Sequence, residues 1–136
     1  MRSPRTVAAW AWTALIFAAC WMPRQLVPEG QGKSSPFAIP HLDKVVHFGM
    51  FAGFGLLWAI ARPGRARWIA AAGVLAAAAT ELGQLMPAVG RDAGLDDGLA
   101  DVAGVAAGLI AAAVLARRHP ALRAESPVRA PSARTP

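Results

Sequence analysis

The apolar residues of this chain fall into four long runs separated by short polar connections. The runs cover residues 6–22, 42–61, 68–86 and 98–116. Each comes close to or reaches the roughly 17–25 residues that a helix needs to cross a bilayer. Pro23 follows the first run and Pro120 follows the fourth, where proline does not continue a helix. This pattern predicts an all-α integral membrane protein built as a four-helix transmembrane bundle.

Composition supports lipid as the solvent of these helices. Hydrophobic residues make up 55% of the chain and charged residues only 16%, whereas about 25% is usual for a soluble domain. A small soluble protein has a large surface for its volume, and that surface must be hydrated. We therefore expect one membrane domain over residues 1–116. Residues 117–136, rich in Pro, Ala, Arg and Ser, are predicted to be a disordered basic tail.

The basic residues predict how the helices are oriented. Cytoplasmic loops of membrane proteins carry an excess of Lys and Arg near the helix ends. With the N-terminus inside, ten of the 14 basic residues lie in the cytoplasm and four outside. Both termini are therefore predicted to be cytoplasmic, in a multi-pass protein of a bacterial cytoplasmic membrane. The net charge of +6 is explained by this topology, and the absence of a basic helix face with interleaved aromatics argues against a nucleic-acid partner.

The single cysteine leaves two interpretations of the first run. Residues 15–20 follow a basic start and end in Cys20, which faintly resembles a lipoprotein signal with its modified cysteine. Phe17 and Trp21 depart from that pattern. We expect a signal-anchor helix that is retained, and processing at Cys20 is the alternative.

Most of the polar residues near the membrane belong to four short patterns. They are Asp43-Lys44-x-x-His47, Glu81-x-x-Gln84, the single residue Arg91, and Asp97-x-x-x-Asp101. Residues three or four apart share one face of a helix. In the predicted topology all four patterns lie at the outer end of the bundle. We therefore expect three helices to meet at one polar, ligand-binding pocket.

Glycines accompany the last of these patterns. Gly104 and Gly108 continue the stripe of Asp97 and Asp101, and small residues at this spacing let helices approach closely. Gly49 and Gly53, also four apart, are expected to supply the facing surface. We assign these four glycines to helix packing.

Each polar residue also has a purely structural explanation. Asp43, Asp96 and Asp97 suit helix starts, where a carboxylate meets free N–H groups. By contrast, His47, Glu81 and Asp101 lie inside apolar runs. An ionisable side chain costs about 2.5–3.5 kcal/mol at the centre of a membrane helix and usually faces a partner or a water-filled cavity. These three residues are therefore the catalytic candidates, although whether any reaction is catalysed stays open.

The same residues in the same order resemble the VanZ-like family of bacterial membrane proteins, which is named for a teicoplanin-resistance protein. The family pattern has Asp-Lys-x-x-His, then Glu-x-x-Gln, then an Arg followed at fixed offsets by Asp, Asn and two Gly. Here Arg91 is followed at those offsets by Asp97, Asp101, Gly104 and Gly108. Asp101 thus stands where Asn is common. The resemblance covers residues 5–116 and implies a four-helix membrane fold linked to the cell envelope or to glycopeptide resistance, without a settled reaction.

Two functions are compatible with this pattern. The first is a pocket at the outer membrane face that handles a lipid-linked envelope precursor or an anionic headgroup, with Lys44 and Arg91 as the cationic groups. The second is a passive scaffold or partner-binding subunit, held together by interhelical hydrogen bonds. A metal site is a sharper version of the first, with ligands from His47, Asp43, Glu81, Asp97 and Asp101. No dense ligand motif marks such a site, so neither metal nor cofactor is predicted, and membrane lipid is the expected partner.

Overall fold

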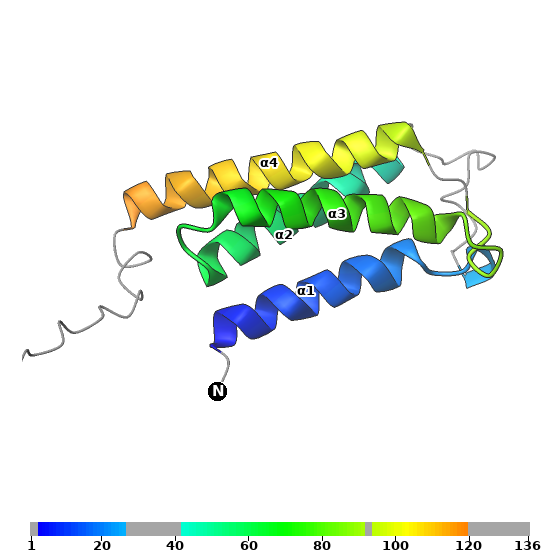
Figure 1. The fold of residues 1–136 in the computed structure, drawn as a ribbon, viewed down its shortest axis with the longest axis horizontal. Helices are drawn as coiled ribbons and strands as arrows, with labels where there is room; N and C mark the ends of the chain where they lie inside the picture. Colours follow the sequence, from blue (N-terminus) through cyan, green and yellow to red (C-terminus); the bar gives the residue numbers. More distant parts are fainter. Residues whose placement is uncertain (1–2, 27–41, 92–93, 120–136) are drawn as a thin grey trace, which may run out of the picture.

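In the computed structural model, which describes residues 3–26, 42–91 and 94–119, these residues form four α-helices and no strand (Figure 1). The α-helices are α1 (Pro4–Cys20), α2 (Leu42–Ala61), α3 (Ala66–Gln84) and α4 (Leu95–Arg118), and a short 3-10 turn, η1 (Arg24–Leu26), follows α1. The all-helical prediction is confirmed. The tail predicted over residues 117–136 begins later than expected, because Arg117 and Arg118 belong to the last turn of α4. The residues beyond 119 and the connection over residues 27–41 lie outside the described residues.

Local sequence explains where these helices begin and end. The Ser3 side chain accepts a hydrogen bond from the Thr6 backbone N–H at 3.3 Å, and Pro4 occupies the first turn of α1. Between α2 and α3, Gly64 has a φ of +78°, which a glycine adopts without the steric cost of a Cβ. The α2–α3 turn is therefore tight, and it carries a cluster of arginines at one end of the bundle.

Helices α2 and α4 pack against each other most extensively, and glycine is the reason. A Cβ on Gly104 or Gly108 would overlap the carbonyl oxygen of Phe48 or Ala52, respectively. Gly55 of α2 makes the reciprocal approach, because its Cβ would lie 2.5 Å from the Val105 carbonyl oxygen. The two backbones are thus in direct contact along the middle of the bundle.

The face of α2 that packs against α4 is not the one that the sequence predicted. A Cβ added to Gly49 would have no neighbour within 4 Å, and Gly53 lies against the Trp12 indole of α1 instead of α4. Residues 48, 52 and 55 follow one face of α2, whereas residues 49 and 53 are rotated from it by about 100° each. A pair of glycines four apart marks a face of α2 but does not say which helix packs there.

Helix α1 is held in the bundle by tryptophan hydrogen bonds. The Trp12 indole N–H donates to the Met50 carbonyl at 2.8 Å, and the Trp58 indole N–H donates to the Thr13 hydroxyl at 3.0 Å. Cys20, at the end of α1, is 1% exposed and packs in the core with Ile16. The first helix therefore contributes to the same core as the other three.

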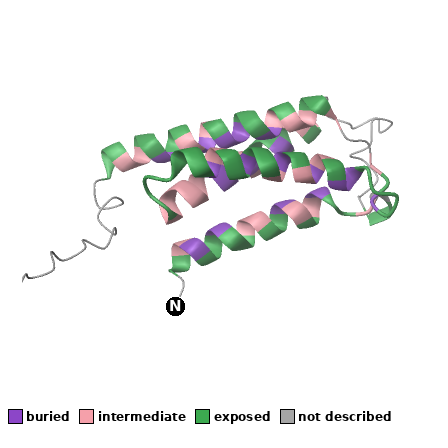
Figure 2. Cartoon of the chain, viewed as in Figure 1, coloured by how far each residue is buried: buried purple, intermediate pink, exposed green. Residues whose placement is uncertain are grey.

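The outer surfaces of the helices are strongly apolar. Large side chains such as Leu75, Leu99 and Ile110 are 64–71% exposed, and exposed positions run along all four helices (Figure 2). Helices α2 and α4 are each long and apolar enough to cross a membrane. Such a surface suits lipid contact, because lipid tails are as apolar as these side chains.

Candidate functional site

Three of the helices bring the predicted polar residues to one end of the bundle. The start of α2, the end of α3 and the start of α4 lie there, together with the end of α1 (Figure 1). The arginine-bearing α2–α3 turn is at the opposite end. The alternating directions of α2, α3 and α4 thus place motifs far apart in sequence beside one another.

The deepest contact of this end joins α2 to α4. The Nδ1 atom of His47 lies 3.0 Å from Oδ1 of Asp101, and the two residues are only 4% and 0% exposed. One turn earlier on each helix, Lys44 and Asp97 are also paired. The shared face that the spacing predicted for Asp97 and Asp101 is therefore turned toward α2.

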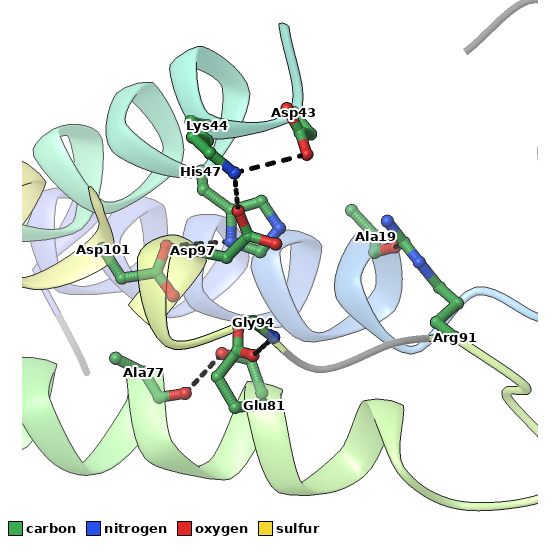
Figure 3. Close-up of polar contacts among 11 residues, drawn as sticks. Ala19, Asp43, Lys44, His47, Ala77, Glu81, Arg91, Gly94, Asp97 and Asp101 are labelled. Carbon is green, nitrogen blue, oxygen red and sulfur yellow. Dashed lines mark hydrogen bonds and ion pairs between the residues drawn. The ribbon is translucent and has the colours of Figure 1, made fainter. Parts of the chain in front are cut away.

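Glu81 approaches this pair from α3. Its Oε2 atom accepts a hydrogen bond from the Gly94 backbone N–H at 2.8 Å, which fixes the carboxyl group beside the start of α4. The ligand atoms offered by His47, Glu81 and Asp101 all lie within 4.8 Å of one another. Figure 3 shows the two carboxyl groups turned toward the space next to the His47 ring. The three catalytic candidates thus form one cluster, which we name the buried triad.

A charged rim covers the buried triad at the helix starts. Lys44 Nζ lies 3.1 Å from Asp97 Oδ1 and 3.7 Å from Asp43 Oδ2 (Figure 3). It also lies 2.6 Å from Asp96 Oδ2. Asp97 is the least exposed of these acids, with a side-chain exposure of 15%, against 63% for Asp96. Sequence reasoning missed Asp96 as a partner of Lys44, because its place beside the predicted start of α4 suggested only a cap.

Arg91 and Gln84 lie beside the buried triad, and Arg91 bonds to other parts of the chain. The Arg91 guanidinium donates to the Ala19 carbonyl of α1 at 3.4 Å, and its backbone N–H donates to the Gln84 carbonyl at the same distance. Gln84 is 1% exposed. Arg91 therefore ties the α3–α4 loop to α1 at the side of the cluster (Figure 3).

The cluster is polar beyond what its internal hydrogen bonds satisfy. Within the described parts of the chain, three buried side-chain atoms lack a hydrogen-bond partner: Glu81 Oε1, Gln84 Nε2 and Asp101 Oδ2. Each unsatisfied buried polar atom costs about 1–3 kcal/mol, so native proteins rarely keep several together. Two of these atoms belong to the buried triad, and Gln84 follows Glu81 by one turn of α3, so this end of the bundle is arranged to meet a further group.

The order and placement of these residues agree with a family assignment. The family model described as VanZ/LLP1 matches residues 5–116, which is most of the chain. The protein belongs to the VanZ/LLP1 family. No curated protein and no solved structure matches this chain. The match includes α2, α3 and nearly all of α1 and α4, and so every residue of the buried triad and of its rim.

Within this VanZ/LLP1 domain, Asp101 departs from the family pattern, which commonly has Asn at that position. The His47–Asp101 contact would be available to an amide oxygen as well, since Asn also presents a hydrogen-bond acceptor. The carboxylate therefore adds a charge and a second acceptor oxygen, and this second oxygen is the unpaired Oδ2. The departure thus changes the chemistry of the buried triad itself.

Two grooves occur at the opposite end of the domain, around the α2–α3 turn. One, of about 480 Å³, lies between α1, α2 and α3 and includes Trp10, Trp58 and Arg62 in its walls. The other, of about 430 Å³, lies between the same turn and α4. Neither groove includes a residue of the buried triad.

Proposed function

We propose that this VanZ/LLP1 protein is a multi-pass protein of the bacterial cytoplasmic membrane that acts at the outer face on an envelope component. In this proposal all four helices cross the membrane and both termini are cytoplasmic. The buried triad and its rim then open toward the outside, where lipid-linked precursors of the cell wall are used. Teicoplanin tolerance is the expected phenotype, because the family is of the teicoplanin-resistance type.

The observation that carries the proposal is the group of unpaired polar atoms at one end of an apolar bundle. Glu81 Oε1, Gln84 Nε2 and Asp101 Oδ2 offer two acceptors and one donor in a buried setting. A folded bundle that served only as a scaffold would be more stable with apolar side chains there. The presence of these polar groups is therefore explained if a ligand completes their hydrogen bonds, or if a bound group that acts on the ligand does so.

The site offers two cationic groups, Lys44 and Arg91, to an anionic headgroup. Lys44 has 29% of its side chain exposed and is held by acids that flank it. Arg91 is half-buried at the same end of the bundle, with the Ala19 carbonyl as a partner. A phosphate or carboxylate could replace the Ala19 carbonyl as the partner of Arg91, or bind the Lys44 ammonium group alongside its acids. In either position it gains charge-assisted hydrogen bonds. In this proposal Lys44 and Arg91 select an anionic ligand, and the buried triad meets the groups attached to it.

A drug-sensitivity test checks the proposal. Wild type and Glu81→Gln are produced at matched abundance in a teicoplanin-sensitive host, and the inhibitory concentration of teicoplanin is measured. We expect wild type to raise that concentration and Glu81→Gln to reduce it to the level of the empty vector. Leu82→Ala is the matched control, because Leu82 is the neighbouring residue on α3 and is 67% exposed on the outer surface.

Two results would contradict the proposal. If wild type gives no tolerance, the assigned phenotype is wrong. If Glu81→Gln is as protective as wild type, the cluster is a structural hydrogen-bond network, and the protein is a scaffold or partner-binding subunit. Abundance is measured by quantitative immunoblot of membranes, so that loss of protein is not mistaken for loss of function.

A further inference from the structure

The buried triad has the composition of a metal-binding site. It offers one imidazole nitrogen and two carboxylate groups, each from a different helix, with ligand atoms that all lie within 4.8 Å of one another. Donor atoms bound to one ion at about 2.0–2.2 Å lie roughly 3–4 Å apart. The ligand atoms as they stand are at most 4.8 Å apart, so a small contraction of the cluster brings them to the spacing that an ion requires.

The unpaired oxygens provide a second observation. Asp101 is completely buried, and its Oδ2 atom has no partner among the described residues. Glu81 Oε1 is likewise buried and unpaired within the same part of the chain. The other oxygen of each carboxyl group is held, by His47 and by the Gly94 N–H respectively. These bonds orient both free oxygens toward the space between α3 and α4 (Figure 3).

Charge balance favours an ion over a side chain as the missing partner. Two carboxylates this close repel each other in a medium of low dielectric constant. The neighbouring cations are engaged outside the cluster: Lys44 binds Asp96 and Asp97, and Arg91 donates to Ala19. A divalent cation would compensate both carboxylates at once and accept electron pairs from the free oxygens.

We propose that His47, Glu81 and Asp101 bind one divalent transition-metal ion, of the Zn²⁺ or Mn²⁺ type. Imidazole together with carboxylate suits these ions, whereas Mg²⁺ and Ca²⁺ prefer oxygen ligands alone. Three protein ligands leave coordination positions for water or a ligand, as in catalytic metal sites. This inference goes beyond the function proposed above. Its test measures bound metal, whereas the proposed function is tested by teicoplanin tolerance, so either proposal can fail without the other.

The experiment measures metal on the purified full-length protein in detergent, isolated with an affinity tag that contains no histidine. After chelation, the protein is titrated separately with Zn²⁺, Mn²⁺ and Mg²⁺, and bound metal is determined by mass spectrometry and calorimetry. We expect one Zn²⁺ or Mn²⁺ per chain and much weaker Mg²⁺ binding. Asp101→Asn and His47→Gln should each lower the affinity at least tenfold, because each removes a direct ligand.

Matched controls come from the same chain. Asp96→Asn removes an exposed carboxylate from the first turn of α4, and His119→Gln removes an exposed imidazole from its other end. Both controls should bind metal like wild type. Circular dichroism and size-exclusion chromatography establish that each variant is folded.

Wild-type protein provides a measurement that does not depend on any variant. X-ray absorption of the Zn²⁺-loaded protein should show one imidazole and otherwise oxygen ligands. The proposal is overturned if wild type binds no Zn²⁺ or Mn²⁺ at millimolar metal, or if the two ligand variants bind as tightly as the controls. It is equally overturned by a first coordination sphere that contains sulfur from Cys20 or lacks nitrogen.

Discussion

Gly108 of α4 lies directly against the carbonyl oxygen of Ala52 in α2, with no room for a Cβ between them. The Leu56 backbone nitrogen is also only 2.7 Å from that Cβ position. Because both neighbours are backbone atoms, no change of rotamer relieves the overlap. This contact sets the distance between the two helices that carry His47 and Asp101. The spacing of the buried triad therefore depends on a glycine two turns below it.

Gly108→Ala should consequently destabilise the protein. Overpacking of a close contact costs about 1–3 kcal/mol, and here it exceeds the roughly 1 kcal/mol that alanine gains over glycine in a helix. The measurement is thermal unfolding in detergent followed by circular dichroism at 222 nm.

Gly49→Ala is the matched control for this prediction. Gly49 is in α2 and has open space around its Cβ position, so alanine should leave stability unchanged or raise it by up to about 1 kcal/mol. Equal effects of the two substitutions would mean that α2 and α4 are not in backbone contact at Gly108.

Trp12 provides a second prediction, on the attachment of α1. Trp12→Phe keeps an aromatic ring against Gly53 but removes the donor to the Met50 carbonyl. The net loss of one hydrogen bond costs about 0.5–1.5 kcal/mol, and the smaller ring adds to that cost. Trp10→Phe serves for comparison, since the Trp10 side chain is 51% exposed. If Trp10→Phe is the more destabilising, the Trp12 bond does not hold α1 in place.

The sequence predicted the bounds of some helices better than those of others. The apolar run 42–61 has the same bounds as α2, because Pro40 disfavours helix just before the run and Arg62-Pro63-Gly64 breaks the helix after it. By contrast, α4 begins at Leu95 and not at residue 98. Asp96 and Asp97 form its first turn, where carboxylates favour the positive end of the helix dipole. A hydropathy pattern counts those same acids as a connection.

The sequence predicted which residues belong to the candidate site, but not which of them contact each other. Spacing indicated that Asp97 and Asp101 share a face, and this holds in α4. The glycine pattern also indicated that this face meets α2, but it pointed to the wrong face of α2, because the contact depends on how the helices are rotated and how far they overlap. The partner of Arg91 was hidden for the same reason, because Ala19 is recognised only by its backbone carbonyl. Any residue type supplies that group.

The rim makes a third prediction, concerning Lys44 and two of its three acidic partners. Asp97→Asn should cost more than Asp96→Asn, because the Asp97 side chain is 15% exposed and that of Asp96 is 63% exposed. An exposed ion pair contributes about 0.2–1 kcal/mol, whereas partial burial raises the cost of losing one partner.

A double-mutant cycle isolates the Lys44–Asp97 pair. The combined variant Lys44→Gln with Asp97→Asn should be less destabilised than the sum of the two single variants, by about 0.5–1 kcal/mol. The free energies come from thermal unfolding at low salt, and the coupling should shrink in about 1 M NaCl because salt screens exposed charges. Additive single effects would show that the pair does not interact in the folded protein.

The orientation of the bundle decides which side of the membrane the site faces, and it yields the last prediction. Ala88 is exposed in the α3–α4 loop beside the site, and Ala66 is exposed at the α2–α3 turn at the other end. Single cysteines at these positions are treated on intact cells with a membrane-impermeant maleimide. We expect Ala88→Cys to react on intact cells and Ala66→Cys only after the cells are opened, because the arginines near Ala66 favour the cytoplasm. Wild type sets the background, since its Cys20 is 1% exposed. The reverse labelling pattern would place the buried triad on the cytoplasmic side and rule out action at the outer face.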